Sequence, residues 1–409
     1  MKPVLVNFVR DTPLGRDAAA LLRACVHCGA CAPTCPTFQL LGDELDSPRG
    51  RIYQMKMVLE GRRPATRETL AHLDRCLGCR TCEAVCASGM HYAALLDIGR
   101  VLIEGRVARP WRERVARALV RSVIPHPGRF TPLLRLGQLV RPLMPTALKR
   151  RIPARRRAVE WPASRHARRM LVLDGCVQPA IAPNINAAAA RVLDRLGISL
   201  VRAQSAGCCG ALHQHTSDPS GALDFARRNI DAWWPHVEAG CEAIVTTASG
   251  CGLHVKEYGH LLRGDPTYAA RAKRVSQMAR DLSEVVARED LGRLEPGVPA
   301  GTKVAFQSPC SLQHGQRLNG VVEKILSEAG FVLTEVPDRY LCCGSAGSYA
   351  LLQPGIASRL KRNKVAALES ARPDLIASAN IGCLVHLQSG TDLPVRHWIE
   401  LFQLPRGDA

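Results

Sequence analysis

From about residue 168 to the C-terminus, short apolar runs alternate with segments of helical periodicity, and the whole order occurs twice. The strands expected in the first copy are RRMLVLDG, ISLVRA and AIVTTAS, and those in the second are KVAFQS, FVLTEV and DLIASAN. The expected helices are NAAAARVLDRLG and ALDFARRNIDAWWPHVEAG, then GVVEKILSEAG and IASRLKRNKVAALES. Strands that alternate with helices of this length predict a parallel sheet in each half.

The N-terminal part has helical periodicity only. Residues 47–61 begin with a Ser-Pro start signal, and their apolar positions share one face of a helix. That face holds Ile52, Met55, Val58 and Leu59. Arg49 and Arg51 lie at the start of this helix, either near a bound group or in a solvated basic turn.

Between these two parts lies a strongly basic stretch. Residues 100–169 hold nineteen Arg or Lys and three Glu, which is +16 of the +19 formal charge of the chain. Val115, Leu119 and Val123 form one apolar stripe there, and a second stripe follows after a Pro-containing break. The second stripe comprises Leu133, Leu136, Val140 and Leu143.

A basic amphipathic hairpin of this kind suits the surface of an anionic membrane. The alternatives are a solvated linker and a surface for an acidic subunit. A nucleic-acid partner is not expected, because aromatic side chains are only 4% of the chain and no reading module is recognisable. The remaining composition, 46% hydrophobic and 22% charged, is that of an ordinary folded protein.

Seventeen cysteines change the picture most. In the N-terminal stretch MKPVLVNFVRDTP the uninterrupted apolar run is too short for a secretion signal. No other window of the sequence is long and apolar enough to span a membrane. We therefore expect a cytoplasmic protein whose closely spaced cysteines are metal or redox ligands rather than disulfides.

Eight cysteines form two C-x2-C-x2-C-x3-C motifs, at positions 25–35 and 76–86. In this spacing three thiolates surround one iron-sulfur cube while the fourth cysteine reaches the neighbouring cube. The expected ligands of one [4Fe-4S] cluster are Cys25, Cys28, Cys31 and Cys86, and those of the other are Cys76, Cys79, Cys82 and Cys35. Structural zinc is the alternative, but zinc sites need two pairs of ligands rather than runs of three. Pro36 follows the first motif, whereas Ala87 stands at that place after the second.

Eight further cysteines recur at matching intervals in the two C-terminal copies. The first copy holds Cys176, Cys208, Cys209 and Cys251, and the second holds Cys310, Cys342, Cys343 and Cys383. Two of each four follow a strand, and each Cys-Cys-Gly sequence is expected to open a helix, so each set should converge at the carboxyl edge of its sheet. Cys241 has no counterpart and is expected to be a buried packing residue.

A tandem ferredoxin motif followed by two Cys-Cys-Gly (CCG) repeats resembles the iron-sulfur subunits of the heterodisulfide reductase type, and most closely those of glycolate oxidase. The strings RACVHCGACAPTCPTFQLLGDELDSPRGRIY, HLDRCLGCRTCEAVCASG, NIDAWWPHVEAG, LCCGSAGSYAL and NIGCLVHL carry this resemblance. It implies an electron carrier with two [4Fe-4S] clusters in a glycolate dehydrogenase complex whose acceptor is not oxygen. FAD would sit on partner subunits, and the electrons would pass to a membrane quinone at the inner face of the cell membrane.

The repeats depart from this pattern at one position. Where heterodisulfide reductases have a fifth cysteine, this chain has Ala248 in one copy and Asn380 in the other. Four thiols per copy suit a further iron-sulfur cluster, a redox dithiol, a metal-free remnant or part of a quinone pocket. No catalytic acid, base or nucleophile is expected from this chain, and no dinucleotide-binding or P-loop motif is present in its sequence.

The expected fold is a multidomain α+β protein, with an α-helical ferredoxin-type domain followed by two pseudo-repeated α/β domains. We place the ferredoxin-type domain at 1–104, the basic connecting region at 105–167, and the two CCG repeats at 168–300 and 301–409. The rival functions are the iron-sulfur subunit of a D-lactate or glycerol-3-phosphate dehydrogenase, and a zinc protein associated with nucleic acid.

Overall fold

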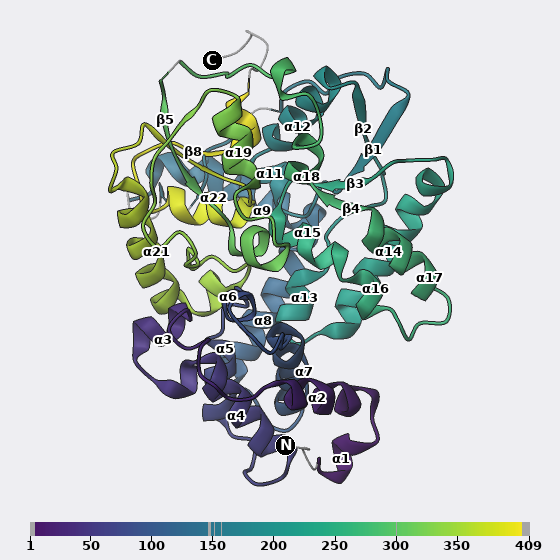
Figure 1. Cartoon of the computed structure of the whole chain (residues 1–409), viewed down its shortest axis with the longest axis vertical. Helices are drawn as coiled ribbons and strands as arrows, with labels where there is room; N and C mark the ends of the chain where they lie inside the picture. Colours follow the sequence, from purple (N-terminus) through teal and green to yellow (C-terminus); the bar gives the residue numbers. More distant parts are fainter. Residues whose placement is uncertain (1–4, 146–148, 151, 157, 300, 403–409) are drawn as a thin grey trace.

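The computed structural model describes residues 5–145, 149–150, 152–156, 158–299 and 301–402. The first four residues of the N-terminal stretch, together with Arg151 and Arg157 of the basic stretch, lie outside the described residues. A helical N-terminal part occupies one end of the molecule, and two α/β units lie side by side at the other (Figure 1). The N-terminal helices are α1 (Asn7–Arg10), α2 (Pro13–Ala24), α3 (Pro36–Leu41), η1 (Glu44–Asp46), α4 (Pro48–Leu59), α5 (Arg67–Asp74), α6 (Thr81–Ala84) and α7 (Tyr92–Glu104).

Helix α4 confirms the helix expected after the Ser-Pro signal. The Ser47 hydroxyl accepts a hydrogen bond from the Gly50 backbone N–H, which caps the helix, and Pro48 occupies the first helical position. All four residues of the expected face are buried, and Met55 packs against Gly99 of α7. A Cβ at Gly99 would lie 2.2 Å from the Met55 sulfur, so the absence of a side chain there lets α4 and α7 come close.

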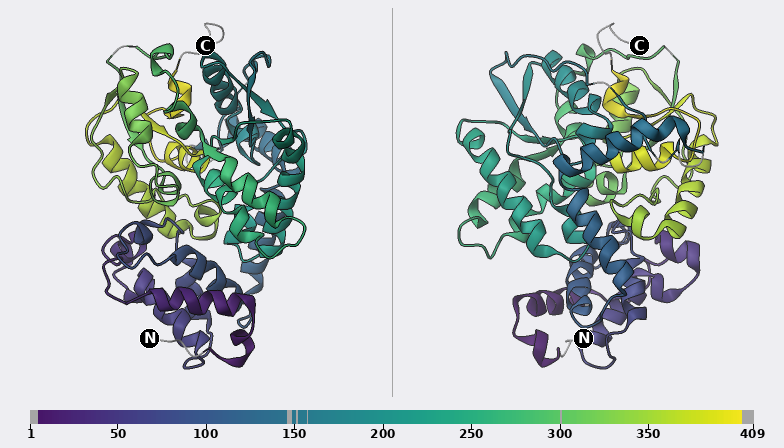
Figure 2. Two further views of the ribbon diagram at one scale, coloured as in Figure 1. Left: turned by 45° about the vertical axis from the view of Figure 1, so that its right-hand side comes forward. Right: turned by 180° about the vertical axis from the view of Figure 1, so that it is seen from behind.

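Two helices and a short 3-10 turn follow, namely α8 (Trp111–Val123), α9 (Pro127–Val140) and η2 (Arg141–Leu143). They cross the back of the molecule (Figure 2, right). The hairpin expected in the basic stretch is therefore present. In α8 the apolar stripe is not the buried side, because Arg117 is 6% exposed whereas Leu119 is 58% exposed.

Each α/β unit contains a four-stranded parallel sheet. The first unit comprises β1 (Arg168–Val172), α11 (Gln178–Ile181), α12 (Asn184–Arg195), β2 (Ile198–Arg202), α13 (Ala211–His215), α14 (Pro219–Glu238), β3 (Ile244–Thr246), α15 (Ser249–Lys256), α16 (Tyr258–Leu261), α17 (Ala269–Met278), β4 (Ala279–Asp281), α18 (Leu282–Val286) and η3 (Leu291–Arg293). The second comprises β5 (Lys303–Gln307), a π-helical turn η4 (Ser311–Gly315), α19 (Val321–Glu328), β6 (Val332–Leu333), α20 (Tyr349–Leu352), α21 (Pro354–Glu369), β7 (Leu375–Ser378), α22 (Ile381–Gln388), β8 (Val395–His397) and η5 (Trp398–Leu401).

The two sheets have the same topology. Their strand orders are β2-β1-β3-β4 and β6-β5-β7-β8. After β1 the chain adds β2 on one side and then β3 and β4 on the other, so the strand order reverses between β1 and β3, and in the same way between β5 and β7. The crevice beyond the carboxyl ends of strands at such a reversal is where open α/β folds bind ligands. In both units this crevice is where cysteines follow the strands.

The structure differs from the expected elements at three places. The fourth strands β4 and β8 were not expected, because three residues are too few for a period-2 pattern to be visible. The expected strand FVLTEV is reduced to the two residues of β6. The second CCG sequence does not open a helix directly, since α20 begins only at Tyr349, whereas α13 begins just after Gly210.

One apolar core joins the two units, with buried side chains from both sheets. Polar contacts at the same junction link Ser249 to Ser311 at 2.8 Å and the His397 imidazole to the Thr247 carbonyl oxygen at 2.8 Å. The Ser249 backbone N–H also donates to the Ala379 carbonyl oxygen. The repeats are therefore packed as one body rather than connected loosely.

Candidate metal centres

The first thiol set combines both N-terminal motifs. Cys25, Cys28 and Cys31 lie in the loop between α2 and α3, and Cys86 follows α6. Burial raises the pKa of Cys25, and the nearby Cys86 and Cys28 thiols raise it further. Burial likewise raises the pKa of Cys31 to about 11, with smaller contributions from Cys25 and Cys28. These contacts bring together the four cysteines expected to form one set.

The second thiol set lies around a cavity between α3, α4, α6 and the loop after α5. Cys35, Cys76, Cys79 and Cys82 all line this cavity. Burial raises the pKa of Cys82, and the Cys79, Cys76 and Cys35 thiols add to the rise. The fourth cysteine of each motif thus lies with the first three of the other, as the spacing predicted.

The chemistry of these donors fits a bound cationic cluster. Several of the thiols are buried and have raised pKa values, so they are poorly ionised without a cation, whereas a coordinated thiol loses its proton. Hydrogen-bond donors already approach the sulfurs: the Gly78 N–H lies 3.4 Å from the Cys76 sulfur, and the Thr81 hydroxyl donates to the Cys79 sulfur at 3.4 Å. Such bonds stabilise negative charge on sulfur and influence the potential of a cluster.

A buried ionic network supports the second set, and sequence reasoning left its central residue undecided. Arg51 is fully buried and donates to the Asp46 carboxylate at 3.2 Å, to the His72 carbonyl oxygen at 2.7 Å and to the Thr37 hydroxyl. A guanidinium nitrogen also lies 3.9 Å from the Cys35 sulfur. A solvated basic turn is therefore wrong for Arg51. The available signal was its position on the same helix face as Ile52, Met55 and Leu59.

Arg49 has a different environment from Arg51. Its side chain is 40% exposed and pairs with Glu44 at 2.8 Å. Arg51 is therefore buried beside the second thiol set, whereas Arg49 lies beside the first, where its backbone N–H donates to the Cys31 thiol.

In the first CCG unit the four cysteines also lie together. The contact between the Cys176 and Cys208 thiols raises the pKa of Cys176 and lowers that of Cys208. Cys209 touches both Cys208 and Cys251, and these contacts raise its pKa. Tyr258 donates to the Cys209 carbonyl oxygen at 2.7 Å and holds this loop in place.

In the second CCG unit the thiols form two close pairs. The sulfurs of Cys310 and Cys342 lie 3.9 Å apart, and those of Cys343 and Cys383 lie 3.4 Å apart. The Gly344 N–H approaches the Cys342 sulfur at 3.4 Å, and the Asn380 side-chain amide donates to the Cys383 sulfur at 3.5 Å. Asn380, which stands where a fifth cysteine was missing, is thus a hydrogen-bond partner of the thiol set.

Cys241 belongs to none of the four thiol sets. It is 8% exposed and packs in the apolar core of the first unit, and its thiol donates to the carbonyl oxygens of Arg169 and Ala243. A packing role, as expected from its lack of a counterpart, agrees with this position.

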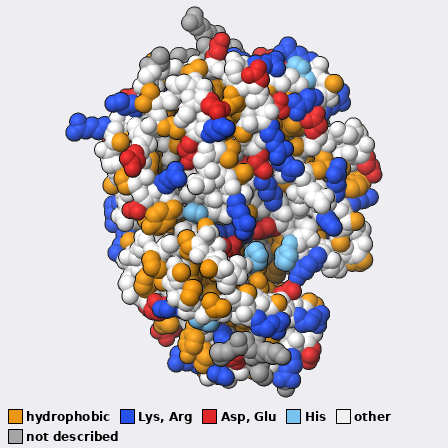
Figure 3. All heavy atoms as spheres, viewed as in Figure 1, with side chains coloured by type: hydrophobic (Ala, Val, Ile, Leu, Met, Phe, Trp, Pro, Cys, Tyr) orange, Lys and Arg blue, Asp and Glu red, His pale blue; other side chains and the backbone are white. Residues whose placement is uncertain are grey.

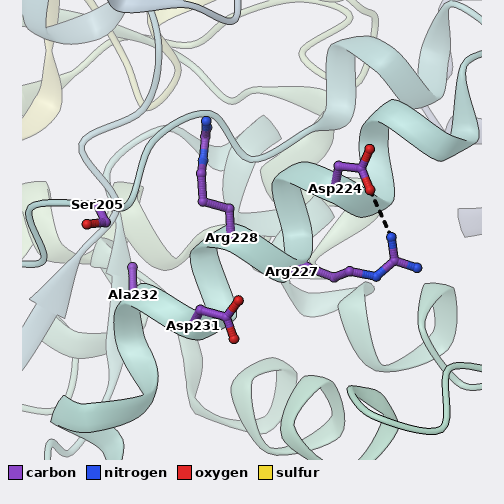
Figure 4. A pocket seen from close by; sticks show the side chains of 6 residues that line it. All are labelled: Ser205, Asp224, Arg227, Arg228, Asp231 and Ala232. Atoms are coloured by element: carbon purple, nitrogen blue, oxygen red, sulfur yellow. Dashed lines mark hydrogen bonds and ion pairs between the residues drawn. The ribbon is translucent and has the colours of Figure 1, made fainter.

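A hollow beside α14 differs from the thiol sites. Four charged side chains line it, two of which, Arg227 and Asp224, pair at 2.8 Å, and no thiol lines it (Figure 4). On the face shown in Figure 3, Lys and Arg are scattered among acidic and apolar side chains. Over the described residues, no helix has the length and apolar character needed to cross a membrane.

Comparison with protein families agrees with this division. Residues 21–90 match the 4Fe-4S dicluster domain, and residues 170–256 and 304–388 each match the cysteine-rich domain called CCG. The N-terminal part is therefore an iron-sulfur module that carries two [4Fe-4S] clusters, and the zinc alternative is not supported.

Two relatives match nearly the whole chain, and a third matches about half of it. The glycolate oxidase iron-sulfur subunit of Escherichia coli (strain K12) is 52% identical over 98% of both chains. The probable glycolate oxidase iron-sulfur subunit of Bacillus subtilis (strain 168) is 31% identical over 92% of this chain and 90% of its own. Lactate utilization protein A of the same strain is 26% identical over 52% of this chain and 87% of its own. Full-length similarity at this level shows that the chain belongs to the family of glycolate oxidase iron-sulfur subunits.

Proposed function

We propose that this chain relays electrons one at a time within a glycolate dehydrogenase complex. A flavin on a partner subunit would oxidise glycolate to glyoxylate, and this chain would pass the two electrons singly towards a membrane quinone rather than oxygen. The observation that carries the proposal is the pair of four-thiol sets, each completed by a cysteine from the other motif. A flavin accepts electrons in pairs and releases them singly, which suits acceptors that take one electron each.

The ligand assignment belongs to the same proposal. Cys25, Cys28, Cys31 and Cys86 would hold the first cluster, and Cys35, Cys76, Cys79 and Cys82 would hold the second. When bound, the clusters supply the one-electron chemistry.

The residues around the second set position it and adjust its charge. The Thr81 hydroxyl and the Gly78 N–H donate to the sulfurs, and the Arg51 cation lies against Cys35 while Asp46 balances its charge. With a cluster bound, the two donors to sulfur would stabilise its reduced, more negative state.

The substrate is tested by reduction of the clusters. We expect the iron-loaded chain, mixed anaerobically with its flavin subunits, to lose its visible absorbance when glycolate is added, and to keep it when the flavin subunits are absent. D-lactate and glycerol 3-phosphate serve as the comparison substrates. Bleaching that glycerol 3-phosphate causes and glycolate does not would overturn the proposal. The full-length similarity to glycolate oxidase subunits, against half-length similarity to a lactate utilization protein, supports glycolate first.

We also propose that the α8–α9 hairpin holds the complex on the inner face of the cell membrane. On the inward side, the buried Arg109 just before α8 and the buried Arg117 of α8 both pair with Asp74 of the N-terminal module. The hairpin exposes many large hydrophobic side chains, with the exposed Arg112, Arg114 and Arg129 among them. The exposed large hydrophobic side chains are Trp111, Val115, Leu119, Leu133, Leu136, Leu139, Val140 and Leu143. Leucines exposed by 60% at Leu136 and 88% at Leu143, beside further arginines, match an anionic lipid interface.

This attachment predicts a specific loss. The double variant Leu136→Glu/Leu143→Glu should no longer sediment with vesicles that contain phosphatidylglycerol at physiological salt, because each carboxylate would have to enter the lipid interface. Leu351→Glu is the matched control, since Leu351 is a 61% exposed leucine outside the hairpin and should leave binding unchanged. Equal sedimentation of all three proteins would contradict lipid binding through this surface.

A further inference from the structure

The two CCG thiol sites are alike in topology but differ in their contact with the second cluster site. The C-terminal site shares one buried apolar cluster with the N-terminal module. Leu77 and Cys79 of the module pack there with Cys342, Tyr349 and Leu360. Cys310 and Leu40 border the same cluster. A ligand of the proposed second cluster therefore shares one buried apolar cluster with the C-terminal CCG thiols.

Further contacts hold this junction together. The Tyr349 hydroxyl donates to the Arg75 carbonyl oxygen at 2.9 Å, directly before Cys76. Helix α6, which carries Cys82, packs on the turn η4 that follows Cys310. These contacts hold the C-terminal CCG site against the second cluster site.

The N-terminal CCG site, formed by Cys176, Cys208, Cys209 and Cys251, contacts the N-terminal module through side chains of a different kind. Polar side chains form that junction: Gln214 donates to the Asp97 carboxylate at 3.2 Å, and Arg80 pairs with Glu257 at 2.5 Å. Within the described part of the chain, none of the four N-terminal CCG thiols shares an apolar cluster with a cysteine of the module. Ion pairs and hydrogen-bonded side chains separate this site from the second cluster.

We propose that the C-terminal CCG site, and not the N-terminal one, exchanges single electrons with the second cluster. Tunnelling between redox centres falls steeply with distance, so contact through buried side chains decides which centres communicate. The thiols of this site, with sulfur pairs 3.9 and 3.4 Å apart and N–H donors from Gly344 and Asn380, suit an iron-sulfur group. In the step, one electron leaves the second cluster, which is oxidised by one, and enters the group on the C-terminal thiols, which is reduced by one. No bond or proton is exchanged.

The inference rests on the proposed electron-transfer function, and magnetic resonance tests the two separately. The two clusters of the N-terminal module are adjacent and broaden each other's EPR signals when both are reduced. In the iron-loaded full chain reduced with dithionite, the signal of the second cluster should show a further broadening and faster relaxation than this pair alone produces, because a third paramagnetic centre lies beside it. A second-cluster signal without this further broadening at every level of reduction would overturn the inference. Dithionite needs no partner subunit, so failure of glycolate to reduce the clusters would count against the proposed function alone.

The internal repeat provides a matched pair of variants. Cys342→Ser and Cys208→Ser change the same position of the two CCG sequences. We expect loss of the further broadening in Cys342→Ser, which leaves only the mutual interaction of the two N-terminal clusters, and its retention in Cys208→Ser, with the first-cluster signal kept in both as evidence of folding. The opposite result would overturn the inference. If Cys342→Ser loses both N-terminal signals through misfolding, the measurement on the unchanged chain decides.

Discussion

Cys79→Ser should remove the second cluster, lowering the iron content by about four atoms per chain while the first cluster remains. Electron delivery through the complex should stop, whereas the flavin of the partner subunit should still be reduced by glycolate. The reason is that Cys79 is buried in the wall of the cavity that its set shares, and a serine hydroxyl at this place is a poor iron ligand. Iron and sulfide analysis with EPR measures the loss, and rapid-mixing absorbance follows the flavin.

Cys241→Ser is the control for this experiment. Cys241 is as buried as Cys79 but belongs to neither N-terminal set, and its thiol donates to backbone carbonyl oxygens as a hydroxyl would. Its iron content and electron delivery should equal those of the unchanged chain. An unaltered iron content in Cys79→Ser would disprove the ligand assignment.

Asp46→Ala should destabilise the N-terminal module by about 3–5 kcal/mol, the range measured when one partner of a buried ion pair is removed. Asp46 is fully buried and accepts from Arg51, from Arg75 at 2.8 Å and from the His72 imidazole at 3.0 Å. Its removal would leave the buried Arg51 cation without a counter-charge beside Cys35. Urea unfolding of the iron-loaded chain, followed by the visible absorbance of the clusters, gives the midpoint and the free energy.

The neighbouring Glu44→Ala variant separates burial from charge. Glu44 pairs with Arg49 across a similar distance, but both side chains are more than one third exposed. An exposed pair contributes no more than about 1 kcal/mol, so the midpoint should shift little. If the two variants shifted the midpoint equally, the network around Arg51 would not have the stabilising role assigned to it.

The chemistry of the N-terminal module could be predicted from the sequence because it depends on local spacing. Three thiols at two-residue gaps lie in one loop whatever the rest of the chain does, and the fourth needs only a short segment to reach the other set. The repeat of 32 residues between Cys176 and Cys208 and between Cys310 and Cys342 likewise indicated two equivalent α/β units. The motif spacing and the repeat interval both depend on residues that lie close together along the chain.

Long-range contacts could not be predicted in this way. Nothing in the spacing of Cys79 indicates that it lies beside Cys310, more than 200 residues away, because that contact depends on how whole units pack. The fate of Arg51 depended on Asp46 and on the His72 carbonyl oxygen, which reach it from two other elements. The periodicity of α8 showed two faces, but which face turns inward was decided by Asp74 on another helix.

The crossing of the fourth cysteines bears on how the protein is matured in the cell. Because Cys86 lies with the Cys25 set and Cys35 with the Cys76 set, the second set is not complete until translation has passed Cys82, and the first not until it has passed Cys86. Neither set of four sulfurs therefore forms until the second motif has been made and the two loops have met. Insertion of both cubes should therefore follow folding of the helices between the two motifs, and chains that end before the second motif should carry neither cube.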